Sequence, residues 1–124
     1  MADFLHDDVF DSGLSVLDTL AENLYICSTL PTTFLEASST YKLGTKATPT
    51  VSAPADRVGG GRKVTVSAIT DGTVSASGTA GFYALTDDSL SKLLAQGDLS
   101  ATQVVTSGNT FTLTAFDIGI PDPA

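Results

Sequence analysis

The segment RVGGGRKVTV, residues 57–66, combines three glycines with Arg57, Arg62 and Lys63 directly before a predicted β-strand. A phosphate-binding loop of the G-x-x-x-x-G-K-[ST] type needs a Ser or Thr after the lysine and a helix whose N-terminus holds the phosphates. Here Lys63 is followed by Val64 and an extended segment. The segment also does not fit a dinucleotide-binding fingerprint, because the glycines of that motif follow a strand, whereas the glycines here precede one. The sequence therefore predicts a solvated loop or a contact with a partner, and it argues against a phosphate site.

Residues that could act in catalysis or bind a metal are few. His6 is the only histidine, so a Ser-His-Asp or Cys-His arrangement would have to recruit it from an acidic N-terminal segment. The pairs Asp7–Asp8 and Asp87–Asp88 lack the spacing of a calcium-binding loop, and Asp87–Asp88, ahead of SLSKLL, is better explained as a turn or a helix cap. One histidine and one cysteine cannot supply a zinc site. We therefore predict no enzymatic activity, no cofactor and no metal site.

The composition is that of a lightly charged, hydroxyl-rich chain of 124 residues, the length of one domain. Hydrophobic residues make up 42% and charged residues 16%, while 13 serines and 18 threonines suit β-strands with a solvated threonine face. The net charge of −8 argues against binding to nucleic acid or to an anionic membrane. The single cysteine, Cys27, cannot form an intrachain disulfide and is expected to be a small buried strand residue.

Targeting sequences are not expected in this chain. Its start, MADFLHDDVF, is acidic where a secretion signal needs positive charge. No apolar run approaches the ~18 residues that a membrane span requires. We therefore expect a soluble protein that is made in the cytosol.

Residues 1–41 are predicted to form a helical N-terminal segment with one strand. Between Phe4 and Leu24 the apolar residues recur at spacings of three and four, which indicates an amphipathic helix. The sequence NLYICST then has the composition of a strand. TFLE, residues 33–36, has the spacing of a capping box, which predicts a short helix that runs to about Tyr41.

From about Pro49 the apolar residues alternate with polar ones, as they do in half-buried β-strands. The sequences RKVTVSAI and NTFTLTAF predict two buried rows, formed by Val64, Val66 and Ala68 and by Phe111, Leu113 and Ala115. A tight hairpin is expected at Asp71–Gly72, and SGN before Thr110 predicts another turn. Residues 42–62, with two prolines and the three consecutive glycines of RVGGGR, are expected to form a long irregular connection.

These patterns predict a mainly β fold with an α+β layout. Turn sequences every eight to twelve residues indicate an antiparallel β-sandwich or a small β-barrel, preceded by the N-terminal amphipathic helix. The chain is predicted to be a single domain, 1–124, in which residues 49–124 form the antiparallel β-rich body.

Charge is distributed unevenly along the chain. Residues 1–36 hold seven carboxylates and no Lys or Arg, whereas residues 42–63 hold five of the six basic residues. Complementary fields of this kind can guide one copy onto another or onto an acidic scaffold. The same distribution also fits two solvated faces of a monomer.

Binding to carbohydrate stays open as another function. Sugar-binding β-sandwiches usually stack the sugar on Trp or on a cluster of Tyr. This chain has no Trp and three scattered tyrosines, Tyr25, Tyr41 and Tyr83.

Four blocks of the sequence resemble small structural proteins encoded among the virion genes of tailed bacteriophages and prophages. The blocks are LHDDVFDSGL, ICSTLPTTFLEASSTYKLG, GRKVTVSAITDGTVSASGTA and VTSGNTFTLTAFDIGIPDP. The resemblance implies a head decoration or cement protein, a small β-rich module that sits on the outside of the capsid as an oligomer, often a trimer. Its partner would then be the major capsid protein, its location the capsid surface of the virion, and its place of synthesis the cytoplasm of the host bacterium.

Two regions are predicted to contact the capsid. One is the N-terminal segment with Phe4, Leu5, Val9 and Phe10, and the other is the basic loop with Arg57, Arg62 and Lys63. An alternative is that Val9 and Phe10 belong to the core and that the loop is only solvated. Two other functions stay open, a low-copy tail or head-tail joining protein and a sugar-binding module that touches the host surface.

Overall fold

A computed structural model describes residues 14–58 and 61–120. The fold is mainly β, as predicted. Its strands are β1 (Asn23–Cys27), β2 (Lys42–Ala47), β3 (Ala55–Asp56), β4 (Arg62–Val66), β5 (Ile69–Val74), β6 (Gly78–Asp87), β7 (Lys92–Val105), β8 (Thr110–Leu113) and β9 (Phe116–Ile120). The helical elements are α1 (Leu14–Leu20), the π-helical turn η2 (Glu36–Thr40) and the 3₁₀ turn η3 (Asp88–Leu90).

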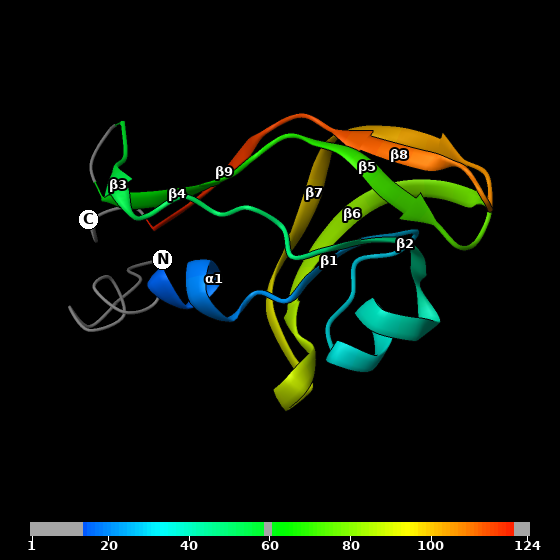
Figure 1. Cartoon of the computed structure of the whole chain (residues 1–124), viewed down its shortest axis with the longest axis horizontal. Coiled ribbons are helices and arrows are strands. Elements are labelled where there is room, and N and C mark those ends of the chain that lie inside the picture. The colour runs from blue at the N-terminus through cyan, green and yellow to red at the C-terminus, as the bar shows by residue number, and fades with distance from the viewer. Residues whose placement is uncertain (1–13, 59–60, 121–124) are drawn as a thin grey trace, which may run out of the picture.

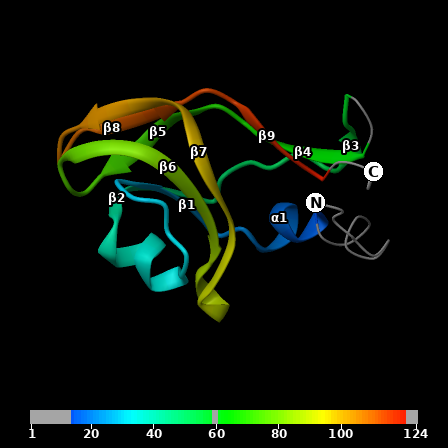
Figure 2. The same ribbon diagram turned by 180° about the vertical axis from the view of Figure 1, so that it is seen from behind.

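The strands form one large curled sheet and one small sheet (Figure 1). The large sheet has the order β7-β6-β1-β2-β5-β8, the small sheet has the order β3-β4-β9, and every ladder is antiparallel. Seen from the front and from behind (Figures 1 and 2), the small sheet and α1 lie at one end of the molecule, and the cyan turn η2 lies against the large sheet. The predicted antiparallel β architecture is therefore confirmed.

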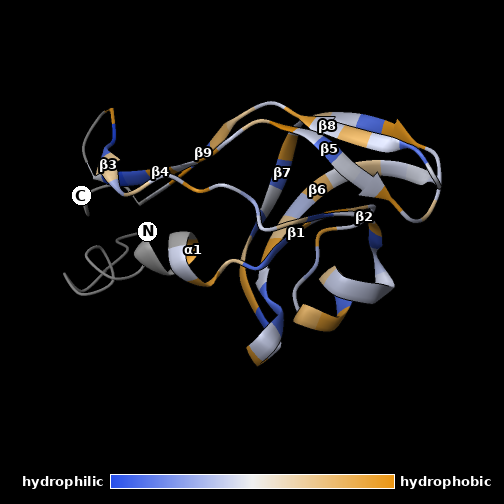
Figure 3. Ribbon diagram, viewed as in Figure 1, coloured by the Kyte–Doolittle hydropathy of each residue, from blue (hydrophilic) through white to orange (hydrophobic). Residues whose placement is uncertain are grey.

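The core lies inside the curl of the large sheet and extends under the small one. Along β4 and β8 apolar and polar residues alternate (Figure 3), so one face of each of these strands supplies the core, whereas β1 is buried on both faces. α1 packs on β4, where Leu14 and Leu17 join Val64 and Val66. The remaining buried residues of this cluster are Leu24, Ile26, Leu43, Val51, Ile69, Val74, Ala80, Leu85, Val105, Phe111 and Leu113.

The predicted buried rows are confirmed at four positions and wrong at two. Val64 and Val66 are fully buried, and Phe111 and Leu113 are buried as well. Ala68 and Ala115 are exposed instead. Each of them follows the last residue of a strand, so the alternation of faces that holds within a strand no longer applies to it.

The predicted hairpin at Asp71–Gly72 is wrong. Both residues lie inside β5, and the pairing of β5 with β8 shifts register between Ile69 and Gly72. Gly72 is needed for close packing and does not form a turn, because a Cβ atom at this position would overlap the ring of Phe111. The predicted turn before β8 is confirmed, with Gly108 at φ +91° and the Asn109 amide donating to Thr106.

The segment 42–62 is not the long irregular connection that was expected. Its first part forms β2, an interior strand that pairs with both β1 and β5. Its residues 55–56 form β3, which pairs with β4, the strand that follows the three glycines in the sequence. The tertiary pairing of β2 outweighs the weak β propensity of KLGTKA.

One short helix lies within the segment that was predicted to be helical. α1 covers Leu14–Leu20, but the earlier part of the predicted N-terminal amphipathic helix lies outside the described residues, and that helix stays a prediction. The apolar spacing of three and four continues to Leu24, but Leu24 belongs to β1, so the strand predicted for NLYICST is confirmed over Asn23–Cys27. The Thr33 hydroxyl accepts from the Glu36 amide at 3.1 Å and so caps the helical turn that leads into η2, as predicted.

Candidate functional site

A large bulge in β7 creates a hollow at the edge of the curled sheet. Ala80 of β6 pairs with Gln103, but the next recorded pair, Phe82 with Asp98, skips residues 99–102 of β7. Four residues of β7 therefore stand opposite Gly81 alone. Bulges of this kind bend a strand and redirect its side chains, and they are common beside binding sites.

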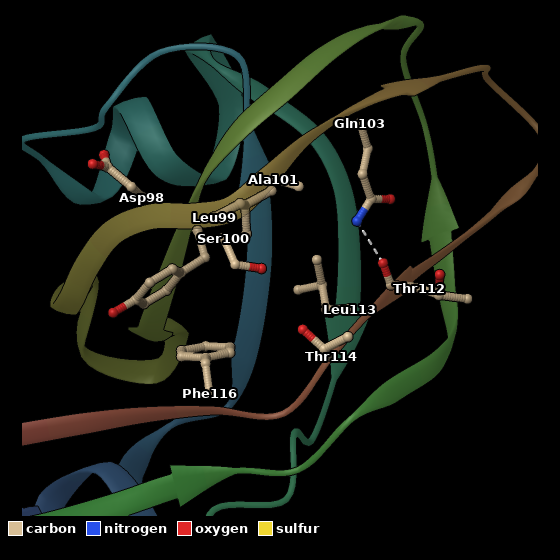
Figure 4. A pocket seen from close by; sticks show the side chains of 10 residues that line it. Asp98, Leu99, Ser100, Ala101, Gln103, Thr112, Leu113, Thr114 and Phe116 are labelled. Atoms are coloured by element: carbon tan, nitrogen blue, oxygen red, sulfur yellow. Dashed lines mark hydrogen bonds between the residues drawn. The ribbon is translucent and has the colours of Figure 1, made fainter.

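The redirected side chains line a cavity of about 180 Å³ between β7 and the segment from β8 to β9 (Figure 4). We call it the seam cavity. Its lining residues are Tyr83, Asp98, Leu99, Ser100, Ala101, Gln103, Thr112, Leu113, Thr114 and Phe116. They come from three separate parts of the sequence, which the curl of the sheet brings together.

Two aromatic rings form one wall of the seam cavity. The ring centroids of Tyr83 and Phe116 are 4.5 Å apart, and the ring planes are tilted by 44°. Gly97 stands opposite Tyr83 in the ladder, and a Cβ atom there would come within 2.9 Å of the tyrosine ring and its hydroxyl. Burial, followed by the nearby charge of Asp98, raises the pKa of Tyr83. The phenol is therefore a neutral hydrogen-bonding group.

At the opposite end of the seam cavity, the side chain of Gln103 links the two strands. The Gln103 amide donates from Nε2 to the carbonyl oxygen of Thr112 at 2.6 Å, which ties β7 to β8 (Figure 4). Hydroxyls of Ser100 and Thr114 complete the polar part of the lining, whereas the carboxylate of Asp98 points away from the cavity (Figure 4). This mixture of apolar wall, hydroxyls and amide suits the binding of a ligand by shape and hydrogen bonds.

The three basic residues predicted as partner contacts lie on the β3–β4 hairpin, which we call the arm. The side chain of Arg62 pairs with Asp56 at 2.6 Å, and Lys63 pairs with Asp117 of β9 at 3.0 Å. The aliphatic stem of Arg57 lies over Gly119, where a Cβ atom would be 3.0 Å from Arg57 Cδ. Arg57 and Lys63 therefore lie on one face of the small sheet, and Arg62, the neighbour of Lys63 in β4, lies on the other.

The apolar contact residues Phe4, Leu5, Val9 and Phe10 lie outside the described residues. The same holds for His6 and for the Asp7–Asp8 pair. The prediction that the N-terminal segment contacts a partner therefore stays a prediction.

Asp87 and Asp88 act as structural groups, as the sequence predicted. The Asp87 carboxylate accepts from the Leu90 amide at 3.3 Å and so caps η3. Asp88 accepts from the hydroxyls of Tyr25 and Thr86. The described residues contain no group of three or more His, Cys, Asp or Glu side chains that could hold a metal ion.

Cys27 is fully buried in β1, as predicted. Burial raises the pKa of its thiol to about 12, and its Sγ contacts the carbonyl oxygen of Ala37 at 3.8 Å. A thiol with such a pKa holds almost no thiolate at neutral pH, so Cys27 is a packing residue.

No protein-family model, curated protein or solved structure matches this chain. Among the described residues, no helix has the length and apolar character needed to cross a membrane.

The seam cavity was not predicted from the sequence. The tyrosines seemed scattered because Tyr83 and Phe116 are far apart in the chain and meet only through the curl of the sheet. The pattern LSATQV was assigned to no element, since an interrupted alternation has no period of its own. The interrupted alternation of apolar and polar residues in this extended segment was the one sign of the bulge that the sequence offered.

Proposed function

We propose that this protein is a structural component of a tailed-phage virion, a decoration protein that binds the outside of the head and stabilises contacts between capsid subunits. The four sequence blocks described above support this proposal. A small β-rich domain of net charge −8 also suits a protein that must remain dispersed at high copy number before assembly.

The arm is the observation that carries this proposal. Val58, at its tip, has a side chain that is 93% exposed, next to Arg57. Figures 1 and 2 show the arm at the end of the molecule, away from the curl of the large sheet. An apolar tip flanked by cations on a projecting hairpin fits a contact with an acidic, partly apolar surface of a neighbouring subunit.

We further propose that the large sheet is a small barrel left open between β7 and β8. The protein would bind the capsid as a homo-oligomer, with a trimer favoured, and the major capsid protein would be its partner. Several arms on one oligomer would bind together more tightly than a single arm, because the second contact forms within the same complex.

The experiment that tests this function is the stoichiometry of the protein in purified particles of the phage or prophage that encodes it. Quantitative mass spectrometry against the major capsid protein is expected to give a ratio near one to one. A ratio of a few copies per particle would overturn the decoration function and favour a tail or head-tail joining protein. Particles that lack the protein are then expected to rupture at a lower temperature than complete ones.

A further inference from the structure

The two outermost strands of the large sheet face each other across the seam cavity. Within the described residues β7 pairs only with β6, and β8 pairs only with β5. The turn at residues 106–109 connects β7 to β8 along the chain, and the two strands lie on different sides of the cavity (Figure 4). Each of them therefore presents an edge with no ladder partner toward the same gap.

One side chain spans the gap between β7 and β8. Paired strands lie about 4.8 Å apart and bond through their backbones. Between β7 and β8 a whole glutamine side chain takes the place of a backbone donor, because Nε2 of Gln103 reaches the Thr112 carbonyl. The carbonyl that an added strand would use is thus already placed to accept a hydrogen bond.

We propose that the seam between β7 and β8 binds an extended polypeptide segment of a virion partner, which adds a strand between the two edges and closes the barrel. The backbone of the segment replaces the Gln103 amide as the donor to Thr112. Main-chain bonds of this kind supply affinity, and the pockets under alternate side chains supply specificity. Closing the sheet also removes two exposed edges, which are otherwise prone to nonspecific pairing.

The lining of the seam cavity indicates the side chains of this segment. One apolar side chain would enter between Leu113 and Phe116. A sugar is less well matched, because Tyr83 is only 9% exposed and its ring already packs against Phe116.

The inference rests on the proposed function for the choice of partner. The probe is an array of overlapping peptides, about ten residues each, that tile the proteins of the particle, with a glycan array run in parallel. Binding of each peptide that the array identifies is measured in solution with the full chain. Hydrogen exchange then reports which backbone amides the peptide protects.

Ser100→Trp fills the seam cavity from an exposed position of β7, and Val104→Trp, at a position that is 84% exposed and outside the lining, is the matched control. Peptide binding is expected to weaken at least about tenfold in Ser100→Trp and to stay within about twofold in Val104→Trp. Amides of both β7 and β8 are expected to gain protection.

Three results would overturn the proposal: no peptide binds, Ser100→Trp binds as well as the wild type, or only glycans bind. A stoichiometry near one to one together with any of these results would leave the decoration function standing and refute the seam alone. A low copy number together with peptide binding in the seam would instead refute the decoration function and leave the seam proposal standing.

Discussion

The ring of Phe111 in β8 occupies the space in which a side chain on Gly72 of β5 would stand. The two residues are register partners in the ladder between β5 and β8. Phe111 is buried, and its ring lies over the backbone of Gly72. The glycine is thus a requirement of packing, and it lies in a strand although Asp-Gly is a common turn sequence.

Gly72→Ala is expected to destabilise the fold by about 2 kcal/mol or more, because the added methyl group forces Phe111 out of its position. Urea unfolding would measure the loss. Gly81→Ala is the matched control, since its Cβ would lie 3.6 Å from Thr102, an ordinary contact, and a small effect is expected. Equal losses in the two variants would contradict the packing argument.

Asp88 joins β1 to the end of β6, since its carboxylate accepts from Tyr25 at 2.6 Å and from Thr86 at 2.5 Å. Burial opposes the charged form, but the bonds from Thr86 and Tyr25 outweigh it, so the pKa of Asp88 is lowered. A lowered pKa stabilises the folded state above the ordinary value of about 3.9. This contribution is lost as the pH falls through the folded pKa.

Tyr25→Phe removes one of these donors and is expected to cost about 1–2 kcal/mol at neutral pH. The difference from the wild type is expected to shrink as the pH falls through the lowered pKa of Asp88, because protonation removes the charge that Tyr25 stabilises. A loss that does not change with pH would show that the charge of Asp88 does not contribute.

Cys27 is expected to resist thiol reagents as long as the protein is folded, because its thiol is buried and its pKa is raised to about 12. Labelling with a chromogenic disulfide reagent would be followed with and without urea. In a Val58→Cys variant one of the two thiols should react at once, because Val58 is exposed, and the other should react only on unfolding. Rapid reaction of both thiols would contradict the observed burial of β1.

Sequence patterns correctly predicted those elements in which the local preference of the chain agrees with the packing around it. The alternation through Val64 and Val66 was confirmed because each residue is buried under a neighbouring element. The cap at Asp87 was confirmed because a carboxylate satisfies a backbone amide three residues ahead, which is a local interaction. Local rules therefore identified four positions of the buried rows, the cap at Asp87 and the turn before β8, but not the end of each row or the strand that holds Asp71 and Gly72.

Features that depend on distant partners were not predictable in this way. β2 has a composition that favours a loop, and it forms a strand because β1 and β5 offer hydrogen bonds on both sides. The seam cavity depends on the bulge opposite Gly81 and on the approach of Phe116 to Tyr83. Neither the bulge nor the aromatic contact produces a periodic pattern in the sequence, because both depend on the strand order and on the curl of the sheet.

Val58→Asp tests the arm as a contact surface. Because Val58 is 93% exposed, the substitution is expected to change stability by less than about 0.5 kcal/mol. Binding to particles that lack the protein is expected to fall at least about tenfold, since a carboxylate would replace the apolar tip beside Arg57. Val104→Asp introduces the same charge on β7 and serves as the control. Unchanged binding of Val58→Asp would remove the arm from the interface.

α1 is expected to contribute to stability through one face only. Leu17 is 6% exposed and packs in the cluster with Val64 and Val66, whereas Leu20, three residues later in the same helix, is 41% exposed. Leu17→Ala should therefore cost about 2–4 kcal/mol by leaving a cavity. Leu20→Ala removes the same atoms and should cost less than about 1 kcal/mol.

Chemical denaturation of the two α1 variants would decide whether this helix is part of the core. If Leu17→Ala proved as mild as Leu20→Ala, α1 would not be packed on β4, and the small sheet would depend on its own three strands. A large loss in Leu17→Ala alone would instead mean that α1 stabilises β4 and, through the pairing of β4 with β3, the position of the arm.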